Sequence, residues 1–387
     1  MRRTFGVVPA TLLILLIPFT VLASSGWSLQ TTPNPSGAMN TFLTGVSCNT
    51  ATACTAVGYS ISTSETVTTL AERWTGTTWS IESTPNPAGG DSSLSAVDCT
   101  GATACTAVGD YFTTSNVEKT LDEHWNGTAW SITTTPNPAG AKGSLLNGVA
   151  CTATASCIAV GSYKKTSSGN PMALAERWNG TAWSILSTPN PSGNRGVTLN
   201  SVGCSSASAC TAAGDWFNSS DTEVTLAERW NGTSWSIQTT INPTTHLSEL
   251  LGVACAAATA CMAVGDEINS SFLEVPLVEQ WNGTSWSVLS TPSISGSMGA
   301  WFESVSCATA TGCNSVGANL NSSGVEVTLA EKWNGSAWSI KSTPNPGTAT
   351  QSFLLAVSCV PTACTATGAY STSSPPSLND LTLAEHT

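Results

Sequence analysis

Short runs of alternating apolar and polar residues, separated by turn-forming residues, fill most of the chain. The run Phe42–Cys48 is followed by a polar loop and Cys54–Gly58, and a later copy contains the runs Val224–Trp230 and Thr233–Ile237. Alternation with a period of two predicts half-buried β-strands, and no stretch beyond the N-terminal segment sustains a helical period. Each unit therefore predicts four strands, which we name strands A, B, C and D in chain order.

The four-strand unit recurs seven times. A tryptophan that precedes a serine marks it at intervals of 51 to 53 residues: Trp27, Trp79, Trp130, Trp183, Trp235, Trp286 and Trp338. Repeats of this length with four antiparallel strands are typical of β-propellers, in which each unit forms one radial blade. We predict an all-β fold, a seven-bladed β-propeller of four-stranded antiparallel blades, over residues 24–387.

The two ends of the chain predict how the ring closes. Residues Trp27–Gln30 match a strand D with no strand C before it, and Leu381–Glu385 match a strand C with no strand D after it. Pairing of these two segments completes the seventh blade and leaves no sheet edge open. We therefore predict that the N-terminal strand closes the last blade.

An Asn-Gly pair joins strands C and D in five units. It predicts a two-residue type I′ turn, because both central residues of that turn need a positive φ. Around Asn231-Gly232 this turn places Trp230 opposite Thr233 and Glu228 opposite Trp235. Paired residues share a face, so we expect the large side chains of strands C and D to pack together against the neighbouring blade.

The N-terminus has the features of a secretory signal peptide. Arg2 and Arg3 precede an apolar segment, Val7–Val21, and Ala23 is a small residue suited to cleavage. The apolar segment is short for a membrane span of about 20 residues. We therefore predict a cleaved signal peptide at residues 1–23 rather than a retained anchor, and a secreted, extracellular protein with no membrane attachment after cleavage.

The 14 cysteines fall in close pairs, one pair in each unit. In an exported chain, one pair per repeat predicts one local disulfide per blade. The pairs are Cys48/Cys54, Cys99/Cys105, Cys151/Cys157, Cys204/Cys210, Cys255/Cys261, Cys307/Cys313 and Cys359/Cys364. Metal binding is the alternative, but the chain has 3 histidines, none of them repeated, so we expect no metal and no cofactor.

Composition narrows the class of partner. Charged residues make up 9% of the chain, and the formal net charge is −12 with 12 Lys and Arg in total. Nucleic acid and anionic membranes bind clusters of Lys and Arg, so we exclude both as partners. We expect a monomer that binds a glycan or an extracellular protein.

The strand order predicts two different faces of the disc. The A–B and C–D turns share one face, which carries the cysteine pairs, while the B–C and D–A loops share the other face and vary among the units. Binding residues concentrate on loops held by a rigid scaffold, so we expect a ligand on this second face, called the variable face below. Aromatic residues are the candidate contacts, suited to stacking on sugars or anchoring a protein: Tyr59, Tyr111, Tyr163, Trp216, Trp301 and Tyr370. The alternative is that these rings only cover the strand ends.

A glutamate recurs in strand C of every unit: Glu72, Glu123, Glu176, Glu228, Glu279, Glu331 and Glu385. A ring of acids suggests metal binding or catalysis, but strand C is third from the axis, and these residues face tryptophans. A residue present in every blade is typical of architecture, so we predict structural supports between blades.

Catalytic motifs are absent, since the sequence contains neither G-x-S-x-G nor H-E-x-x-H. Glycoside hydrolysis needs only two carboxylates and leaves no such motif. We therefore predict no catalytic residue and favour a non-enzymatic binding or scaffold propeller that uses the B–C and D–A loops. A secreted glycosidase or lyase with one site at the propeller axis is the alternative.

The unit L-A-E-R-W-N-G-T-x-W-S-I, with its T-P-N-P loop and cysteine pair, resembles a repeat of exported, mostly uncharacterised proteins of actinobacteria and other soil bacteria. The resemblance covers nearly all of the chain beyond the leader and implies a propeller shape similar to that of kelch and sialidase proteins. It implies no activity, because propellers support many unrelated functions.

Overall fold

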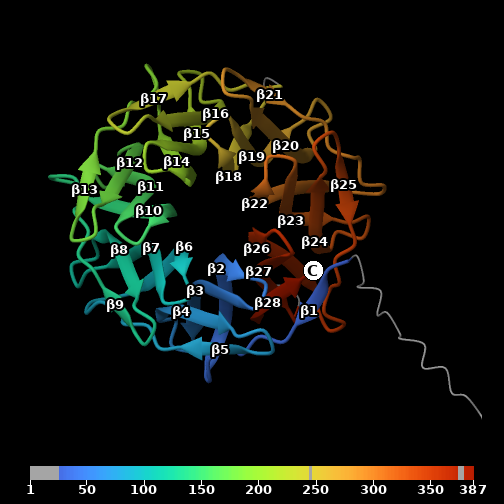
Figure 1. Ribbon diagram of the computed structural model, residues 1–387, viewed down its shortest axis with the longest axis horizontal. Helices are drawn as coiled ribbons and strands as arrows, with labels where there is room; N and C mark the ends of the chain where they lie inside the picture. The colour runs from blue at the N-terminus through green and yellow to red at the C-terminus, as the bar shows by residue number, and fades with distance from the viewer. Residues whose placement is uncertain (1–25, 244–245, 374–378) are drawn as a thin grey trace, which may run out of the picture.

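The computed structural model describes residues 26–243, 246–373 and 379–387, so the expected leader at residues 1–23 lies outside the described residues. The described chain forms seven four-stranded sheets, and none of it forms a helix of the length and apolarity that crossing a membrane requires. The sheets stand around a central axis as the blades of a propeller (Figure 1). The predicted all-β, seven-bladed fold is confirmed.

Each blade has strand A nearest the axis and strand D at the rim (Figure 1). Blades are numbered 1 to 7 in chain order of their strands A, so blade 1 contains β2 and blade 7 contains β26. The strands A are β2 (Ala38–Thr50), β6 (Ser92–Gly101), β10 (Gly143–Ala153), β14 (Val197–Ser206), β18 (Ser248–Ala257), β22 (Gly299–Thr309) and β26 (Gln351–Val360). The strands B are β3 (Ala53–Ser62), β7 (Ala104–Phe112), β11 (Ser156–Lys164), β15 (Ala209–Phe217), β19 (Ala260–Ile268), β23 (Gly312–Leu320) and β27 (Ala363–Ser371). The strands C are β4 (Val67–Trp74), β8 (Glu118–Trp125), β12 (Pro171–Trp178), β16 (Glu223–Trp230), β20 (Glu274–Trp281), β24 (Glu326–Trp333) and β28 (Asp380–His386). The strands D are β5 (Trp79–Glu82), β9 (Trp130–Ile132), β13 (Trp183–Leu186), β17 (Trp235–Gln238), β21 (Trp286–Val288), β25 (Trp338–Lys341) and β1 (Ser28–Gln30).

The first strand of the chain completes the last blade. β1 pairs antiparallel with β28, and Leu29 lies opposite Glu385 in this pairing. Trp27, just before β1, is buried in a cluster with Leu354 and Leu383 of the same blade. The predicted closure of the ring by the N-terminal strand is therefore confirmed.

The hairpin between strands C and D has a different register from the one predicted. Trp230 lies opposite Trp235, and Glu228 lies opposite Ile237, so the predicted register was wrong by two residues. Side chains alternate between faces with a period of two, so a shift of two leaves every side chain on the face that was predicted.

Side-chain capping explains the wider turn. The Asn231 Oδ1 accepts hydrogen bonds from the N–H groups of Thr233 and Ser234, at 2.9 and 3.0 Å. Only Gly232 has a positive φ, of 96°, so the loop is an Asx turn and the predicted type I′ turn was wrong. A Cβ on Gly232 would lie 2.9 Å from the Ser208 Cβ in the A–B turn of the same blade. The C–D and A–B turns therefore meet on one face, and glycine is the residue that fits between them.

All seven cysteine pairs form disulfides within their own blades, as predicted: Cys48–Cys54, Cys99–Cys105, Cys151–Cys157, Cys204–Cys210, Cys255–Cys261, Cys307–Cys313 and Cys359–Cys364. Each bridge joins strands A and B beside the A–B turn, and Cys204 lies directly opposite Cys210. The face that carries these turns is therefore built alike in every blade.

The hydrophobic core lies between blades. Leu250, Leu277 and Trp286 of blade 5 form one buried cluster with Ala213 and Ala227 of blade 4. The large side chains of one blade thus pack against small side chains of the preceding blade, and tight packing of this kind holds each blade at a fixed angle to the next.

Candidate functional site

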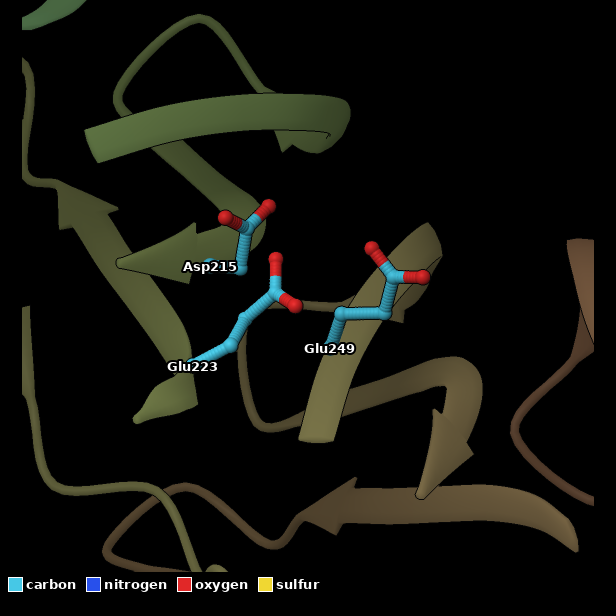
Figure 2. Close-up of side chains that lie close together, drawn as sticks. All are labelled: Asp215, Glu223 and Glu249. Carbon is cyan, nitrogen blue, oxygen red and sulfur yellow. The ribbon is translucent and has the colours of Figure 1, made fainter. Parts of the chain in front are cut away.

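Three carboxylates converge on the variable face at the boundary between blades 4 and 5 (Figure 2). Asp215 lies near the end of β15, Glu223 begins β16, and Glu249 is the second residue of β18. One oxygen atom of each side chain lies within 4.8 Å of those of the other two. Figure 2 shows Asp215 and Glu223 side by side, with Glu249 beside them on a separate strand.

Burial and mutual repulsion raise the pKa values of these three groups. Burial raises the pKa of Glu223 to about 8, and the charges of Asp215 and Glu249 add to this effect. Burial and the charge of Asp215 raise the pKa of Glu249 to about 6. Burial also raises the pKa of Asp215, although the Asn200 amide donates a hydrogen bond to its Oδ1 at 3.1 Å and opposes this rise. A cation placed among these groups would relieve the repulsion.

Acidic groups continue from this cluster into blades 5 and 6. Burial, followed by the charges of Glu249 and Glu274, raises the pKa of Asp266 to about 8. Burial raises the pKa of Glu303 to about 7, and it also raises the pKa values of Glu274 and Glu326. We call the whole set the acidic arc: Asp215, Glu223, Glu249, Asp266, Glu274, Glu303 and Glu326.

The acidic arc reaches the central channel at Glu303. A cavity of about 160 Å³ in this channel is lined by all seven strands A, and its lining includes one set of equivalent positions: Thr44, Ser95, Asn147, Asn200, Leu251, Glu303 and Leu355. Glu303 is the one acid among these seven residues. The indole N–H of Trp301 donates a hydrogen bond to the Glu303 Oε1 at 3.0 Å. The aromatic candidate Trp301 therefore lies beside the arc.

The other predicted aromatic contacts have packing partners. Four of them pack against the hydrophobic clusters between blades: Tyr111, Tyr163, Trp216 and Tyr370. Tyr59 stacks on Phe42, with ring centroids 5.0 Å apart. Trp301 differs from these five rings in donating a hydrogen bond to a member of the acidic arc.

The repeated glutamates of strand C are buried between blades, with an exposed fraction of 0%: Glu72, Glu123, Glu176, Glu228, Glu279, Glu331 and Glu385. Burial raises the pKa of Glu228 to about 8. The Ile241 N–H donates to the Glu279 Oε2 at 3.1 Å, which connects blade 5 to the loop after β17 of blade 4. These residues lie in the third strand from the axis and take no part in the acidic arc.

Basic residues occupy a different sector of the ring. Lys119, Lys142, Lys164 and Arg195 lie at or beside the variable-face loops of blades 2 to 4. After residue 195 the sequence has three further basic residues, all inside strands C or D: Arg229, Lys332 and Lys341. The variable face is therefore electrostatically one-sided, with its acidic sector over blades 4 to 6.

This arrangement supports two kinds of chemistry. Clustered carboxylates attract ammonium, guanidinium and hard metal ions, and their oxygen atoms are the ligands that Ca²⁺ and Mg²⁺ prefer. Two carboxylates whose pKa values are separated by their surroundings can also act as a general acid and a general base.

Sequence reasoning missed the acidic arc because its members come from separate strands of three blades. The signal lies in a comparison of the units position by position. Asp215 and Asp266 occupy the position that holds Tyr59 in the first unit and Ser162 in the third. The residue type at this position varies among the units, so a search for repeated residues does not identify these acids.

The fold defines the chain as a seven-bladed β-propeller, and its variable face carries the acidic arc on one side. No protein-family model and no curated protein sequence matches the chain. Among solved structures, YCF48 bound to a D1 peptide is similar at 13% identity and a TM-score of 0.53, covering 94% of this chain and 97% of that one. The PL25 ulvan lyase, bound to -[GlcA(1-4)Rha3S]-, has 9% identity and a TM-score of 0.55, with 89% and 94% covered. A protein of unknown function from Dyadobacter fermentans has 7% identity and a TM-score of 0.52, with 94% and 98% covered. Identities this low show the propeller fold and nothing finer.

Proposed function

We propose that this protein is an extracellular binding propeller that captures a cationic partner on the acidic sector of its variable face. The observation that carries the proposal is the convergence of Asp215, Glu223 and Glu249 within 4.8 Å. Carboxylates held this close repel one another, and a Lys or Arg side chain, or an amino sugar, would stabilise all three at once.

Two further features support a cationic partner. The formal net charge of −12 attracts cations over long distances and accelerates encounter. Trp301 adds an aromatic face beside Glu303, and a cation bound there would gain cation–π stabilisation. Neighbours with this fold bind a peptide and a glycan in their own structures, and both kinds of ligand suit such a face.

The test measures affinity for poly-L-lysine at pH 8, with neutral dextran as the ligand control. The variant Glu223→Gln/Glu249→Gln should bind about tenfold more weakly, because two of the three converging carboxyl groups are lost. The matched control is Asp110→Asn/Glu118→Gln, which removes the two blade-2 acids at the positions of Asp215 and Glu223 and should bind within about threefold of wild type.

Two outcomes would contradict the proposal. One is an absence of poly-L-lysine binding above that of dextran. The other is an equal loss of binding in the two double variants, which would assign the attraction to net charge and not to this site. Binding should also weaken as salt is raised, because exposed charges are screened.

A second candidate function is glycoside hydrolysis. The observation that favours it is the pair Glu223 and Glu249, whose pKa values are raised to about 8 and about 6 and whose oxygen atoms lie within 4.8 Å. A protonated acid beside an ionised one is the arrangement that glycosidases use. A lyase acting on an anionic polysaccharide is disfavoured, since the acidic arc would repel such a substrate.

Reducing-end release from neutral and amino-sugar polysaccharides tests the second candidate. Hydrolysis that is lost in Glu223→Gln, with polysaccharide binding retained, would support it. An absence of product with every polysaccharide would exclude it for those substrates and leave the binding function.

A further inference from the structure

A hydrogen-bonded clamp fastens the D–A loop to strand C in six blades. The asparagine of each T-P-N-P segment, or of its I-N-P variant, accepts a hydrogen bond through Oδ1 from a backbone N–H of strand C. Asn86 accepts from the Thr69 N–H at 3.0 Å, and Asn242 accepts from the Thr225 N–H at 2.9 Å. The equivalent asparagines of the remaining blades are Asn137, Asn190, Asn345 and Asn34, with distances of 3.0 to 3.3 Å.

Blade 5 lacks both partners of this clamp. Pro276 occupies the donor position and has no N–H, while Ser293 occupies the asparagine position. The next residue, Ile294, stands where the other blades have proline. Donor and acceptor are replaced in the same blade, so neither is left buried without its partner. Ile294 instead packs against the hydrophobic cluster that contains Val278 of strand C.

A pocket of about 500 Å³ lies where the clamp is missing, between strand C of blade 5 and the start of β22 in blade 6. Leu273, Pro276 and Ile294 form part of its apolar wall, and Glu267 and Glu274 form its acidic wall. A volume of this size is in the range of small-molecule and side-chain sites. Glu274 also belongs to the acidic arc, so the pocket and the arc are continuous.

Exposed apolar side chains gather around the same blade. Among the described residues, one large apolar side chain of strand D is exposed in each blade, and six others are exposed elsewhere. Five of those six lie in the loops that flank blade 5: Ile241, Leu247, Phe272, Leu273 and Met298. An exposed apolar cluster beside a pocket is typical of a protein-binding surface.

Phe272 carries the strongest departure from the repeat. Its φ is 58°, and the equivalent residues Asn116, Asp221 and Gly324 also have positive φ. A bulky residue is costly in this conformation, whereas Asn, Asp and Gly adopt it readily. Phe272 is nevertheless 75% exposed, and its ring meets the His246 ring edge-on with centroids 4.9 Å apart. The fold therefore holds a strained aromatic ring at the surface, next in sequence to Leu273 of the pocket lining.

We propose that the blade-5 pocket receives a bulky apolar side chain of an extended peptide segment whose neighbouring Lys or Arg residues contact Glu267, Glu274 and the acidic arc. This inference rests on the proposed capture of a cationic partner and names that partner as a polypeptide. The lining of the pocket includes no aromatic ring on which a sugar could stack, whereas aliphatic walls beside carboxylates complement an apolar residue flanked by basic ones.

The test uses fluorescently labelled nine-residue peptides and measures their affinities by anisotropy. The first peptide has a central leucine with two lysines on each side. The second has serine in place of the leucine, and the third has glutamates in place of the lysines; a chitosan hexamer serves as a cationic glycan. We expect the leucine peptide to bind about tenfold more tightly than the serine peptide and the glutamate peptide not to bind.

Restoring the repeat should close the pocket without damaging the fold. The variant Pro276→Thr/Ser293→Asn/Ile294→Pro reinstates the clamp of the other six blades, so its thermal midpoint should equal or exceed that of wild type. It should lose the tenfold preference for the leucine peptide while its affinity for poly-L-lysine stays within about threefold.

A surface substitution covers the case in which the triple variant fails to fold. Leu273→Ser should lower affinity for the leucine peptide, and its control is Ile340→Ser on the rim of blade 6, because the two side chains are 42% and 45% exposed. Equal affinity for the leucine and serine peptides, equal effects of Leu273→Ser and Ile340→Ser, or tighter binding of the chitosan hexamer than of the leucine peptide would each overturn the inference. Loss of poly-L-lysine binding alone would overturn the proposed function instead.

Discussion

The boundary between blades 2 and 3 and the boundary between blades 4 and 5 start from the same pair of acids. Asp110 and Glu118 hold in blade 2 the positions that Asp215 and Glu223 hold in blade 4. In both pairs the second acid begins strand C, and the first lies near the end of strand B. The two boundaries therefore differ in what the next blade contributes.

Residues of the next blade determine whether the electrostatic repulsion within the pair of acids is offset or increased. In blade 3, Lys164 lowers the pKa of Glu118 against the effect of burial, and strand A presents Leu145. In blade 5, strand A presents Glu249 at the position of Leu145, and its charge helps to raise the pKa of Glu223. The same pair of acids is therefore offset by a lysine at one boundary and joined by a third acid at the other. A function cannot be assigned from the residues of a single repeat, because the adjacent blade supplies the difference.

The largest expected effect is a fall in stability with rising pH. Glu228 has an ordinary pKa of 4.5 and a folded pKa of about 8, so the folded state keeps a proton that the unfolded state releases. The stabilisation is complete below pH 4.5 and is lost as the pH rises through 8. Because Glu223 and Asp266 follow the same rule, the thermal midpoint should be at least about 5 °C higher at pH 5.5 than at pH 8. A scan in which the midpoint rises toward pH 8 would contradict it.

On the face that carries the disulfides, we expect the two boundaries to be equally stable. Removing the blade-5 bridge with Cys255→Ser/Cys261→Ser, or the blade-3 bridge with Cys151→Ser/Cys157→Ser, should lower the free energy of unfolding by about 2 kcal/mol in each case. Denaturant unfolding measures both values, and poly-L-lysine binding should survive both changes. Costs that differ by more than about 1 kcal/mol would show that this face also distinguishes the sectors.

A third acid introduced at the boundary between blades 2 and 3 should reproduce there the repulsion found at the boundary between blades 4 and 5. Leu145→Glu places a carboxylate beside Asp110 and Glu118, so the thermal midpoint should fall by about 2 °C at pH 8. It should change less at pH 5.5, because burial raises the pKa values of Asp110 and Glu118 and so favours their neutral forms as the pH falls. Leu145→Gln is the control for lost packing. If glutamate and glutamine have the same effect at pH 8, the comparison between the boundaries fails.

The smallest expected effect is a difference in thermal midpoint between the single variants Glu223→Gln and Glu118→Gln. Glu223→Gln should raise the thermal midpoint at pH 8 by about 1 °C, because it removes repulsion with Asp215 and Glu249. Glu118→Gln should raise it by less, since Lys164 already offsets part of that charge. Calorimetry of both variants at low salt checks the order, and a larger gain for Glu118→Gln would reverse it.

Most of the fold followed from the sequence because repetition multiplies each signal. Seven copies of the tryptophan, the cysteine pair and the strand pattern predicted the blades, the disulfides and the closure by β1. The C–D register was wrong because Asn231 caps the turn with its side chain, and a backbone preference for Asn-Gly does not reveal this capping. The clamp was missed for a similar reason, since its asparagine stands about 17 residues from its N–H donor, as Asn86 does from Thr69.

The candidate site was less predictable than the fold because several of its residues differ from those at the equivalent positions of the other units. Trp301 was among the predicted aromatic contacts, but its partner Glu303 and the facing acid Glu249 were not predicted. Their convergence depends on how neighbouring blades face each other, and Glu249 and Glu303 are 54 positions apart in the sequence. An alignment of the seven units marks Glu249 and Glu303 as acids at positions where every other unit has an uncharged residue.

Closure of the ring by β1 has a consequence for the order of folding. Each disulfide joins cysteines five or six positions apart, so it can form as soon as its own hairpin has emerged. The circle itself cannot form until the last strand is available, because β1 pairs with residues as late as His386. The blades can therefore be cross-linked one after another on a chain that is still open. Cutting the chain before β28 would leave a row of stapled hairpins with a loose first strand and an incomplete seventh blade.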